Sequence, residues 1–281
     1  MSKNEKLFID CNEFVRDFEK VIKVPVKSKS ANYYTGVDLG TACVVLAVLD
    51  ENQTPVAGAF KYADVVRDGM VVDYMGAVRL VREMKESIEE KLETELVYAA
   101  AAIPPGTDML DGGAVKNVVE AAGFQVTALP DEPTAANNLL KIKNGAVVDI
   151  GGGTTGVSIF KDGKVVFVDD EPTGGTHFSL VISGACKMPY NEADEYKMDS
   201  KNHKEIFPVV KPVIDKISTI IKKIIKDYDV HRIYLVGGSS CLTGIEEVVE
   251  TNLGIPTFKP DNPLFITPLG IALACTGEDE E

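Results

Sequence analysis

Apolar side chains near the start of the chain recur every three or four residues, which is the spacing of an amphipathic helix. Val-Pro-Val at 24–26 ends this helix, and the polar stretch 27–32 is typical of a linker. Two interpretations stay open, because such a helix packs either on the chain's own globular body or on another protein. The apolar positions are Leu7, Phe8, Cys11, Phe14, Val15, Phe18, Val21 and Ile22.

Beyond residue 33, apolar runs typical of buried strands alternate with amphipathic stretches typical of helices. This alternation predicts an α/β protein. The expected strands are residues 34–50, 55–62, 97–103, 125–129, 145–150, 155–160, 165–169 and 232–236. The expected helices are residues 75–92, 110–122, 132–141, 176–187, 191–198, 204–228, 243–252 and 267–276.

One sequence pattern occurs twice, and its copies begin 111 positions apart. Val-Asp-Leu-Gly-Thr at 37–41 returns as Val-Asp-Ile-Gly-Gly-Gly-Thr-Thr at 148–155. In each copy an apolar strand ends at Asp-x-Gly, and a turn of glycine and threonine leads into a second strand, which predicts a β-hairpin. A third apolar strand ends in the small-residue turn Gly-Gly-Ser-Ser at 237–240.

The residue types in these turns suit a nucleotide. Glycine lets the backbone approach a phosphate and direct successive N–H groups at it, while threonine adds a hydroxyl donor. Asp38 and Asp149 supply carboxylates for Mg²⁺, directly or through water, because magnesium keeps most of its hydration shell. Two such hairpins predict a clamp on the phosphates that closes as two lobes move. The string Gly-x-Gly-x-x-Gly at 151–156 is a weak dinucleotide signal, because a strand and a turn follow it instead of a helix.

The composition narrows the class of protein. The 281 residues, 45% hydrophobic and 26% charged, are typical of a globular chain with two domains or lobes. A formal net charge of −14 argues against a general binder of nucleic acid or anionic membrane, which needs a cationic face. Five scattered cysteines, and no apolar run near the ~20 residues that span a bilayer, predict a soluble intracellular protein.

Five motifs, in this order, resemble those of the actin/Hsp70/sugar-kinase ATPase superfamily. Segments 36–41 and 148–154 resemble its two phosphate motifs, and 234–240 resembles its adenosine motif. Glu-Pro-Thr-Ala-Ala at 132–136 and Pro-Leu-Gly-Ile-Ala-Leu at 268–273 resemble its connecting helices. Within the superfamily, the whole chain is similar to the EutJ family, the chaperone-like proteins of ethanolamine utilisation associated with bacterial microcompartments.

The resemblance implies an α/β, two-lobed actin-like ATPase fold, built from duplicated ribonuclease-H-like domains with a small upper insert in each lobe. An N-terminal amphipathic helix and linker would occupy residues 1–30. The first ATPase lobe would comprise residues 31–145 and 263–281, and the second lobe residues 146–262.

The resemblance also implies roles for individual residues. Asp38 and Asp149 would organise Mg²⁺ and its waters for catalysis. Glu132 would orient the attacking water, and a charge favoured by a helix N-terminus is the alternative for this residue. Glu195 and Lys197 would reach the ribose or base, with an ordinary exposed helix as the alternative. The other implied nucleotide-binding residues are Gly40, Thr41, Ala42, Gly151, Gly152, Gly153, Thr154, Thr155, Gly175, Gly237, Gly238 and Ser239.

His177 has two interpretations, a contact to phosphate or its water and, as the favoured one, the start of a helix. The function implied by the resemblance is that of a chaperone-like or assembly protein that binds Mg-ATP and hydrolyses it slowly, because no cationic catalytic side chain is evident. Its partners would be ATP or ADP and ethanolamine-utilisation enzymes or microcompartment components, in the cytoplasm or on the microcompartment. Two other functions stay open: a nucleotide-gated scaffold without significant turnover, and a small-molecule kinase of the same superfamily.

Overall fold

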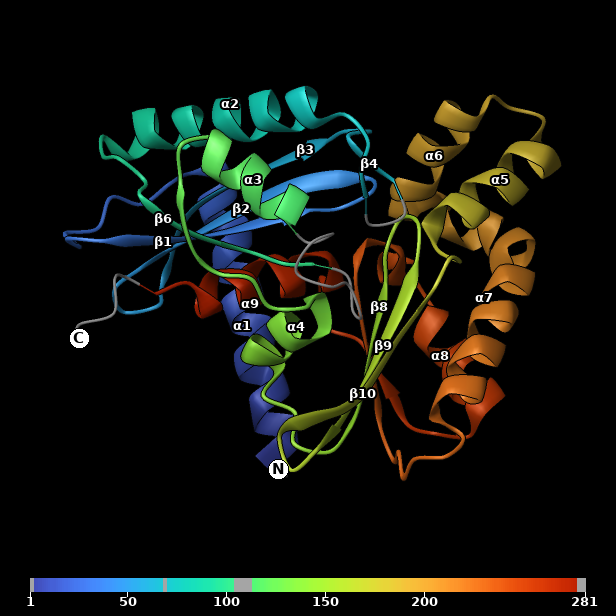
Figure 1. The fold of residues 1–281 in the computed structure, drawn as a ribbon. Helices are drawn as coiled ribbons and strands as arrows, with labels where there is room; N and C mark the ends of the chain where they lie inside the picture. The colour runs from blue at the N-terminus through green and yellow to red at the C-terminus, as the bar shows by residue number, and fades with distance from the viewer. Residues whose placement is uncertain (1–2, 68–69, 104–112, 277–281) are drawn as a thin grey trace. The chain divides into compact units, whose positions relative to one another are not determined.

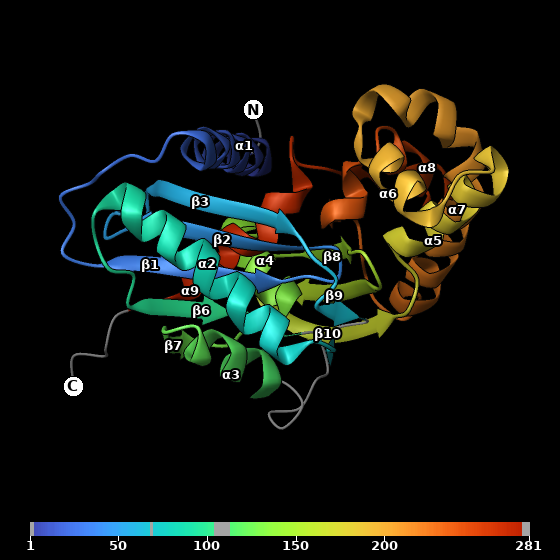
Figure 2. The same cartoon turned by 90° about the horizontal axis from the view of Figure 1, so that it is seen from above.

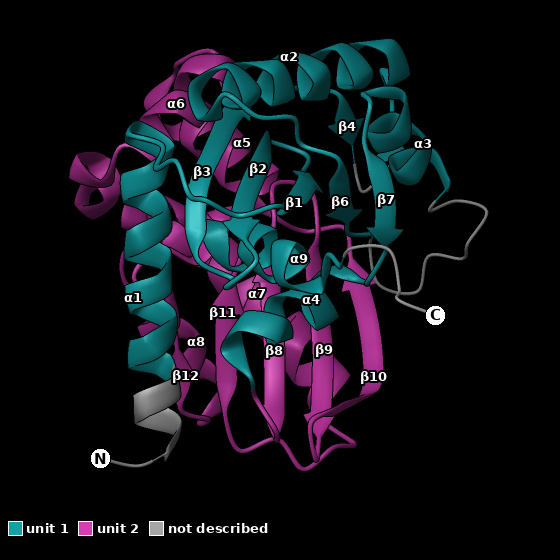
Figure 3. Cartoon of the chain, turned by 90° about the vertical axis from the view of Figure 1, so that its left-hand side faces the viewer, with its two compact units in different colours: residues 1–141, 265–281 teal, residues 142–264 magenta. Residues whose placement is uncertain are grey.

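The computed structural model describes residues 3–67, 70–103 and 113–276. The chain divides into two compact units, residues 1–141 with 265–281 and residues 142–264 (Figure 3). Each unit has its own five-stranded sheet and its own cluster of buried apolar side chains. No helix in the described part of the chain combines the length and apolar character that crossing a bilayer requires.

The sheet of unit 1 has the strand order β3-β2-β1-β6-β7 (Figure 2). The strands β1 (Tyr33–Leu39), β2 (Cys43–Asp50) and β3 (Pro55–Tyr62) form an antiparallel meander. Two further strands run parallel to β1 and to each other, β6 (Tyr98–Ala101) and β7 (Gln125–Ala128). The strand expected at 34–50 is therefore two strands, because the chain turns back at 40–42.

Helices cover both faces of this sheet (Figure 1). On one face lie α2 (Tyr74–Leu92) and α3 (Gly113–Ala121), whose apolar residues join the main core of the unit. On the other lie α4 (Glu132–Leu140) and α9 (Ile266–Ala274), which pack against each other. The backbone of α9 comes so close to β1 that a side chain at Gly36 would overlap the carbonyl of Pro268. The first three residues of the helix expected at 110–122 lie outside the described residues.

The N-terminal helix α1 (Lys3–Lys23) packs on unit 1, chiefly against β3. Its apolar stripe is buried at Cys11, Val15, Phe18 and Val21. The Phe18 ring meets the Phe265 ring edge-on, with centroids 5.2 Å apart. The expected linker at 27–32 is also attached, because the Ser28 carbonyl accepts from the Tyr33 hydroxyl at 2.9 Å and the Asn32 N–H donates to the Glu51 carboxylate at 3.1 Å. Of the two interpretations of this helix, packing on the chain's own body is the one that the structure shows.

Unit 2 repeats the strand order of unit 1, as β10-β9-β8-β11-β12. The strands β8 (Gly145–Ile150), β9 (Thr155–Lys161) and β10 (Lys164–Glu171) are antiparallel, and β11 (Ile233–Val236) and β12 (Thr257–Phe258) continue in parallel. The repeated sequence pattern thus falls on β1–β2 and on β8–β9. Four helices pack with this sheet: α5 (Gly175–Cys186), α6 (Tyr190–Met198), α7 (His203–Ile225) and α8 (Ile245–Leu253).

Short elements account for most of the difference from expectation. The two-residue strands β4 (Val66–Arg67) and β5 (Met70–Val71) pair with each other, and β12 adds the last strand of the second sheet. Two residues are too few to show an alternating pattern, so no signal in the sequence marks these strands. Single-turn 3₁₀ helices likewise occupy 200–202, 238–241 and 263–265.

Candidate functional site

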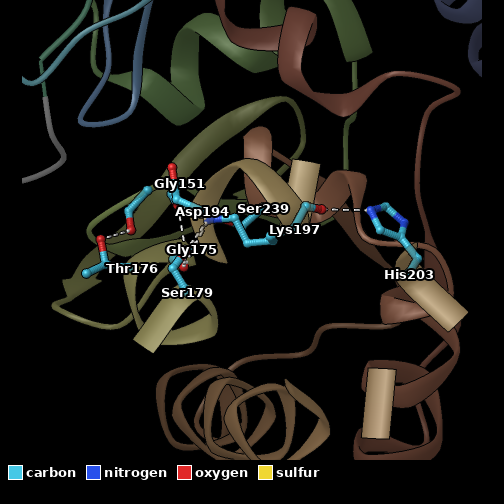
Figure 4. Close-up of polar contacts among 9 residues, drawn as sticks. Gly151, Gly175, Thr176, Ser179, Asp194, Lys197, His203 and Ser239 are labelled. Atoms are coloured by element: carbon cyan, nitrogen blue, oxygen red, sulfur yellow. Dashed lines mark hydrogen bonds and ion pairs between the residues drawn. The ribbon is translucent and has the colours of Figure 1, made fainter. Parts of the chain in front are cut away.

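The turn between β8 and β9, residues 151–154, is fixed by hydrogen bonds to its carbonyl groups. The Gly151 carbonyl accepts from the Gly175 N–H at 2.9 Å and from the Ser239 hydroxyl at 2.7 Å. The Gly152 carbonyl accepts from Thr176, from its N–H at 2.7 Å and its hydroxyl at 2.9 Å (Figure 4). The start of α5 and the 3₁₀ turn after β11 therefore hold this turn from its carbonyl side.

The N–H groups of the same turn are used differently. Gly151 donates across the turn to the Thr154 carbonyl at 3.0 Å. The N–H groups of Gly152, Gly153 and Thr154 donate to no acceptor within the part of the chain that the structure describes. A run of neighbouring N–H groups on a turn whose carbonyls are already bonded is an anion-binding arrangement.

Two glycines are required where backbone segments meet at this turn. A side chain at Gly174 would lie 2.7 Å from the Gly151 carbonyl oxygen and 2.9 Å from the Thr154 nitrogen. Gly237 has a φ of +86°, and a side chain there would overlap the carboxylate of Asp149. The turn after β11 thus approaches the end of β8 at the aspartate of the repeated pattern, and only glycine permits this approach.

A largely buried but not fully enclosed cation, Lys197, lies behind the turn. The Lys197 ammonium donates to the Gly175 carbonyl at 3.1 Å, to the Ser179 hydroxyl at 2.8 Å and to the Asp194 carboxylate at 2.7 Å (Figure 4). Its side chain is only 15% exposed. Burial by itself raises the pKa of Asp194, but the charge and hydrogen bond of Lys197, together with the Ser179 hydroxyl, hold that pKa below its ordinary value. Asp194 therefore keeps its negative charge at neutral pH.

His203 extends this network at the first residue of α7. Its Nε2 lies 3.0 Å from the Lys197 carbonyl, and its Nδ1 accepts from the Thr243 N–H at 3.1 Å. Burial lowers the pKa of His203 below its ordinary value. The hydrogen bond to Lys197 and the charge of Asp199 raise the pKa, and the charge of Lys259 lowers it further, so the net shift is downward. The neutral imidazole is therefore the form that the folded unit favours.

The corresponding turn of unit 1 is Gly40–Thr41–Ala42. The Ala42 carbonyl accepts from the Ala63 N–H at 3.2 Å. The N–H groups of Thr41 and Ala42 have no acceptor among the described residues, as at the 151–154 turn. Asp38 is half-buried near the end of β1, one residue before Leu39. Each unit thus has a turn whose N–H groups include some with no acceptor among the described residues.

Glu132 is the first residue of α4 and is half-buried. Its N–H donates to the Ile103 carbonyl at 3.0 Å. The helix is capped by the preceding Asp131, whose carboxylate accepts from the Thr134 N–H at 2.9 Å and from its hydroxyl at 2.7 Å. A carboxylate at this position is favoured by the helix dipole whether or not it also acts on water.

Several expected ligand contacts have partners inside unit 2. The Thr155 side chain is fully buried and its hydroxyl donates to the Thr173 carbonyl, so this hydroxyl is not presented to a phosphate. The Ser239 hydroxyl donates to the Gly151 carbonyl of the turn, and the Lys197 ammonium donates to the Gly175 carbonyl behind it. Glu195 is exposed on α6. His177 lies in the first turn of α5, and its Nδ1 accepts from the Gly174 N–H at 3.4 Å. This contact agrees with the interpretation of His177 as a histidine at a helix start.

Part of the network behind the turn can be recognised in the sequence. Asp194 lies three residues before Lys197 on a helix, which is the spacing of an ion pair. Ser179 on α5 and His203 on α7 come from other elements, and only the packing of α5, α6 and α7 brings them to Lys197, while Thr243 binds His203. The described residues contain no group of three or more histidine, cysteine, aspartate and glutamate side chains that could hold a metal ion.

Two protein-family models each match part of the chain. A model described as MreB/Mbl protein matches residues 55–193, and one described as cell division protein FtsA matches residues 146–270. The crystal structure of MreB 5 of Spiroplasma citri bound to AMPPNP has a TM-score of 0.70 and 18% identity, covering 86% of this chain and 95% of that one. At this identity the likeness concerns the fold alone.

Two ethanolamine utilization proteins named EutJ are similar over most of their length. The protein of Salmonella typhimurium is 45% identical over 240 residues, which are 85% of this chain and 84% of that protein. The crystal structure of EutJ from Carboxydothermus hydrogenoformans has a TM-score of 0.89 and 47% identity, covering 97% of this chain and 99% of the other. The expected actin-like ATPase fold of α/β class is confirmed by these structures.

Proposed function

This chain belongs to the EutJ family of ethanolamine utilization proteins, and we therefore propose that it binds Mg-ATP through its 151–154 and 40–42 turns. The family expected from the sequence motifs is thus confirmed. The nucleotide is the part that we propose. It is supported by the actin-like fold, by the AMPPNP that the MreB 5 structure contains, and by the backbone of the two turns.

The observation that carries the proposal is the division of roles within the 151–154 turn. Its carbonyl groups bind Gly175, Thr176 and Ser239, whereas its N–H groups from Gly152 to Thr154 have no acceptor among the residues described. Phosphate oxygens accept hydrogen bonds strongly and carry the charge that such N–H groups attract. A protein with a net charge of −14 can still bind phosphate, because the N–H donors of this turn would contact the phosphate oxygens directly.

Magnesium fits the acidic residues available. Mg²⁺ uses one or two protein carboxylates together with phosphate oxygens and several waters, so it does not need a cluster of three acidic side chains. Asp149 and Asp38, each half-buried near the end of the first strand of its unit, would hold the ion or its waters. Bound there, the ion would neutralise part of the phosphate charge.

We further propose slow hydrolysis of ATP. A water oriented by the Glu132 carboxylate would attack the γ-phosphorus as the bond to the bridging oxygen breaks, giving ADP and phosphate. A slow rate follows because Lys197, the cation behind the 151–154 turn, has its ammonium bound to Asp194, Ser179 and Gly175. Without a mobile cation, stabilisation of the transferred phosphoryl group rests on N–H groups and metal.

In the cell this nucleotide cycle would serve a chaperone-like or assembly role for ethanolamine-utilisation enzymes or microcompartment components. The support is the family membership and the similarity of segment 132–136 to Hsp70. The protein would act in the cytoplasm or on the microcompartment. A nucleotide-gated scaffold without turnover is the second candidate, favoured by the binding of Lys197 within its own unit. A small-molecule kinase is the third, tested by screening ethanolamine and sugars for ATP-dependent phosphorylation.

Calorimetric titration tests the binding proposal. We expect Mg-ATP and ADP to bind and chelation of Mg²⁺ to weaken them. Asp149→Asn, which keeps the size of the side chain beside Gly237, should weaken Mg-ATP binding by about 10- to 100-fold through the metal. Asp162→Asn is the matched control, because Asp162 lies exposed in the β9–β10 turn with a φ of 53° that asparagine also adopts. Equal affinities of the two variants would count against the proposed role of Asp149.

Phosphate release measured on the same proteins separates the ATPase from the scaffold. The ATPase proposal expects turnover in the wild type that falls in Asp149→Asn and is kept in Asp162→Asn. Turnover no greater in the wild type than in Asp149→Asn refutes hydrolysis and leaves the scaffold. Absence of any nucleotide binding refutes both.

A further inference from the structure

A continuous path of hydrogen bonds leads from α7 to the 151–154 turn. The Gly175 N–H donates to the Gly151 carbonyl, and the Gly175 carbonyl accepts from the Lys197 ammonium. The Lys197 carbonyl in turn lies 3.0 Å from the His203 Nε2 (Figure 4). His203 thus binds the backbone of Lys197, and the side chain of Lys197 binds Gly175. Gly175 in turn binds the 151–154 turn.

The chemistry of the partners determines which nitrogen of His203 carries the proton. A carbonyl oxygen is only an acceptor, so the nitrogen facing Lys197, Nε2, must carry a hydrogen. The backbone N–H of Thr243 is only a donor, so Nδ1 must offer its lone pair. A single neutral tautomer satisfies both bonds.

Protonation of His203 breaks this arrangement. In the imidazolium both ring nitrogens are donors, so the Thr243 N–H would lose its acceptor and face a second N–H. The Thr243 hydroxyl, 2.9 Å from Nδ1, can accept from the new proton but cannot replace the lost acceptor for the backbone. The ring would have to move, and with it the Lys197 carbonyl at the end of α6.

The charged groups around His203 do not offset the lowering of its pKa by burial. Lys259 lowers the pKa of the imidazole, and its ammonium is bound to the Glu246 carboxylate at 2.7 Å and to the Leu242 carbonyl at 3.1 Å. Asp199 raises the pKa from the turn that precedes α7, but its carboxylate also caps that turn by accepting from the Lys201 N–H at 3.0 Å. Burial is the largest influence, and it favours the neutral form.

We propose that His203 is a positioning residue for the 151–154 turn and that its protonation weakens the binding of a nucleoside triphosphate there. The inference rests on the proposed nucleotide function and adds to it a pH-dependent control. His203 touches neither the turn nor a phosphate; it acts through Lys197 and Gly175. Because the folded-state pKa lies below the ordinary value, full affinity is present above about pH 6.5 and is lost as the pH falls through the lowered value.

Two substitutions separate the two bonds of the imidazole. Glutamine places an amide NH₂ near the position of Nε2, so His203→Gln keeps a donor for the Lys197 carbonyl and has no proton to gain in this range. It loses the acceptor for the Thr243 N–H but, unlike the imidazolium, places no second N–H against it. Asparagine places a carbonyl oxygen near the position of Nδ1, so His203→Asn keeps the acceptor for Thr243 and loses the link to Lys197. His231→Asn is the matched control, because His231 is 82% exposed and its Nε2 pairs with Asp229.

Calorimetry with Mg-ATP between about pH 7.5 and about pH 5 tests the proposal. The wild type and His231→Asn should lose about 10-fold more affinity over this range than His203→Gln, as expected for the loss of a buried hydrogen bond. His203→Asn should bind weakly throughout. Titration of the phosphates is common to all four proteins and cancels in the comparison. Equal loss in the wild type and His203→Gln, or wild-type affinity in His203→Asn, overturns the proposal.

A readout without ligand keeps this inference separate from the proposed function. Amide hydrogen exchange of the segment 150–177 should be faster in His203→Asn than in the wild type at the same pH, and close to the wild type in His203→Gln. If Mg-ATP binds to none of the proteins, the nucleotide function fails, and the exchange data still decide whether His203 positions the turn. Unchanged exchange in a folded His203→Asn, monitored by circular dichroism, overturns the positioning role.

Discussion

At the residue scale, Gly175 lies at the point where three elements meet. Its N–H and carbonyl bind the 151–154 turn and Lys197, so its backbone is used on both sides. The position of a β-carbon there is already filled, because it would overlap the Ser239 hydroxyl oxygen and lie 3.3 Å from the Lys197 ammonium. Gly175, which the sequence motifs assign to nucleotide binding, is thus required for close packing against Ser239 and Lys197.

Replacing Gly175 by alanine tests this arrangement. The added methyl group should turn the Ser239 hydroxyl away from the Gly151 carbonyl, because a serine side chain rotates more easily than backbone moves. Losing one supporting hydrogen bond should weaken Mg-ATP binding about 5- to 10-fold and destabilise the fold by about 1 kcal/mol.

Gly184→Ala is the control for Gly175→Ala, since it lies on the same helix, is exposed and has open space around its α-carbon. Alanine there should leave ATP affinity unchanged and stabilise α5 slightly. Calorimetry and thermal unfolding of both variants provide the comparison. Wild-type affinity in Gly175→Ala would show that the Ser239 contact does not matter for binding.

The repeated pattern let the sequence predict the turn at 151–154, because glycines that follow an apolar strand are typical of a turn. The role of Asp149 toward Mg²⁺ stays a prediction. The sequence could not predict that Ser239, Lys197 and the Thr155 hydroxyl bind the protein itself. A side chain with hydrogen-bonding groups looks the same in sequence whether its partner is a ligand or a backbone carbonyl. That choice depends on how α5 and α6 pack, which local patterns do not contain.

At the element scale, α1 is part of the core of unit 1. The sequence predicted the helix and its apolar stripe, because spacing alone determines which residues share a face. It left open what that face covers, and the structure supplies β3 together with Phe265. The close approach is possible because Gly58 on β3 leaves room for the Phe18 ring, whose Cε2 would lie 2.5 Å from a β-carbon at that position.

Phe18→Ala measures how much α1 contributes to unit 1. Removing a fully buried ring should lower the free energy of unfolding by about 3–5 kcal/mol, because a cavity remains where the ring packed. Ile9→Ala on the same helix is the control, since that side chain is 45% exposed and should cost less than about 0.5 kcal/mol. Chemical denaturation gives both values. Similar small effects would mean that α1 is only loosely attached and free to dock elsewhere.

At the scale of the whole molecule, the two units are variations on one plan. Each has three antiparallel strands followed by two parallel ones, and each carries Asp-x-Gly at the end of its first strand. The repeated sequence pattern was enough to predict this duplication. The last strand of the second sheet, β12, was not predicted, because its two residues are too few to show an alternating pattern. Backbone N–H groups at both turns explain how a chain with a net charge of −14 would bind a polyanion.

Amide hydrogen exchange with and without Mg-ATP tests the central claim most directly, because it reports on the backbone groups themselves. At saturating Mg-ATP, peptides covering 151–154 and 40–42 should exchange more slowly, while the β9–β10 turn at 161–164 in the same unit stays unchanged. Bound nucleotide with no slowing at 151–154 would contradict the claim that phosphates are held by the N–H groups of this turn.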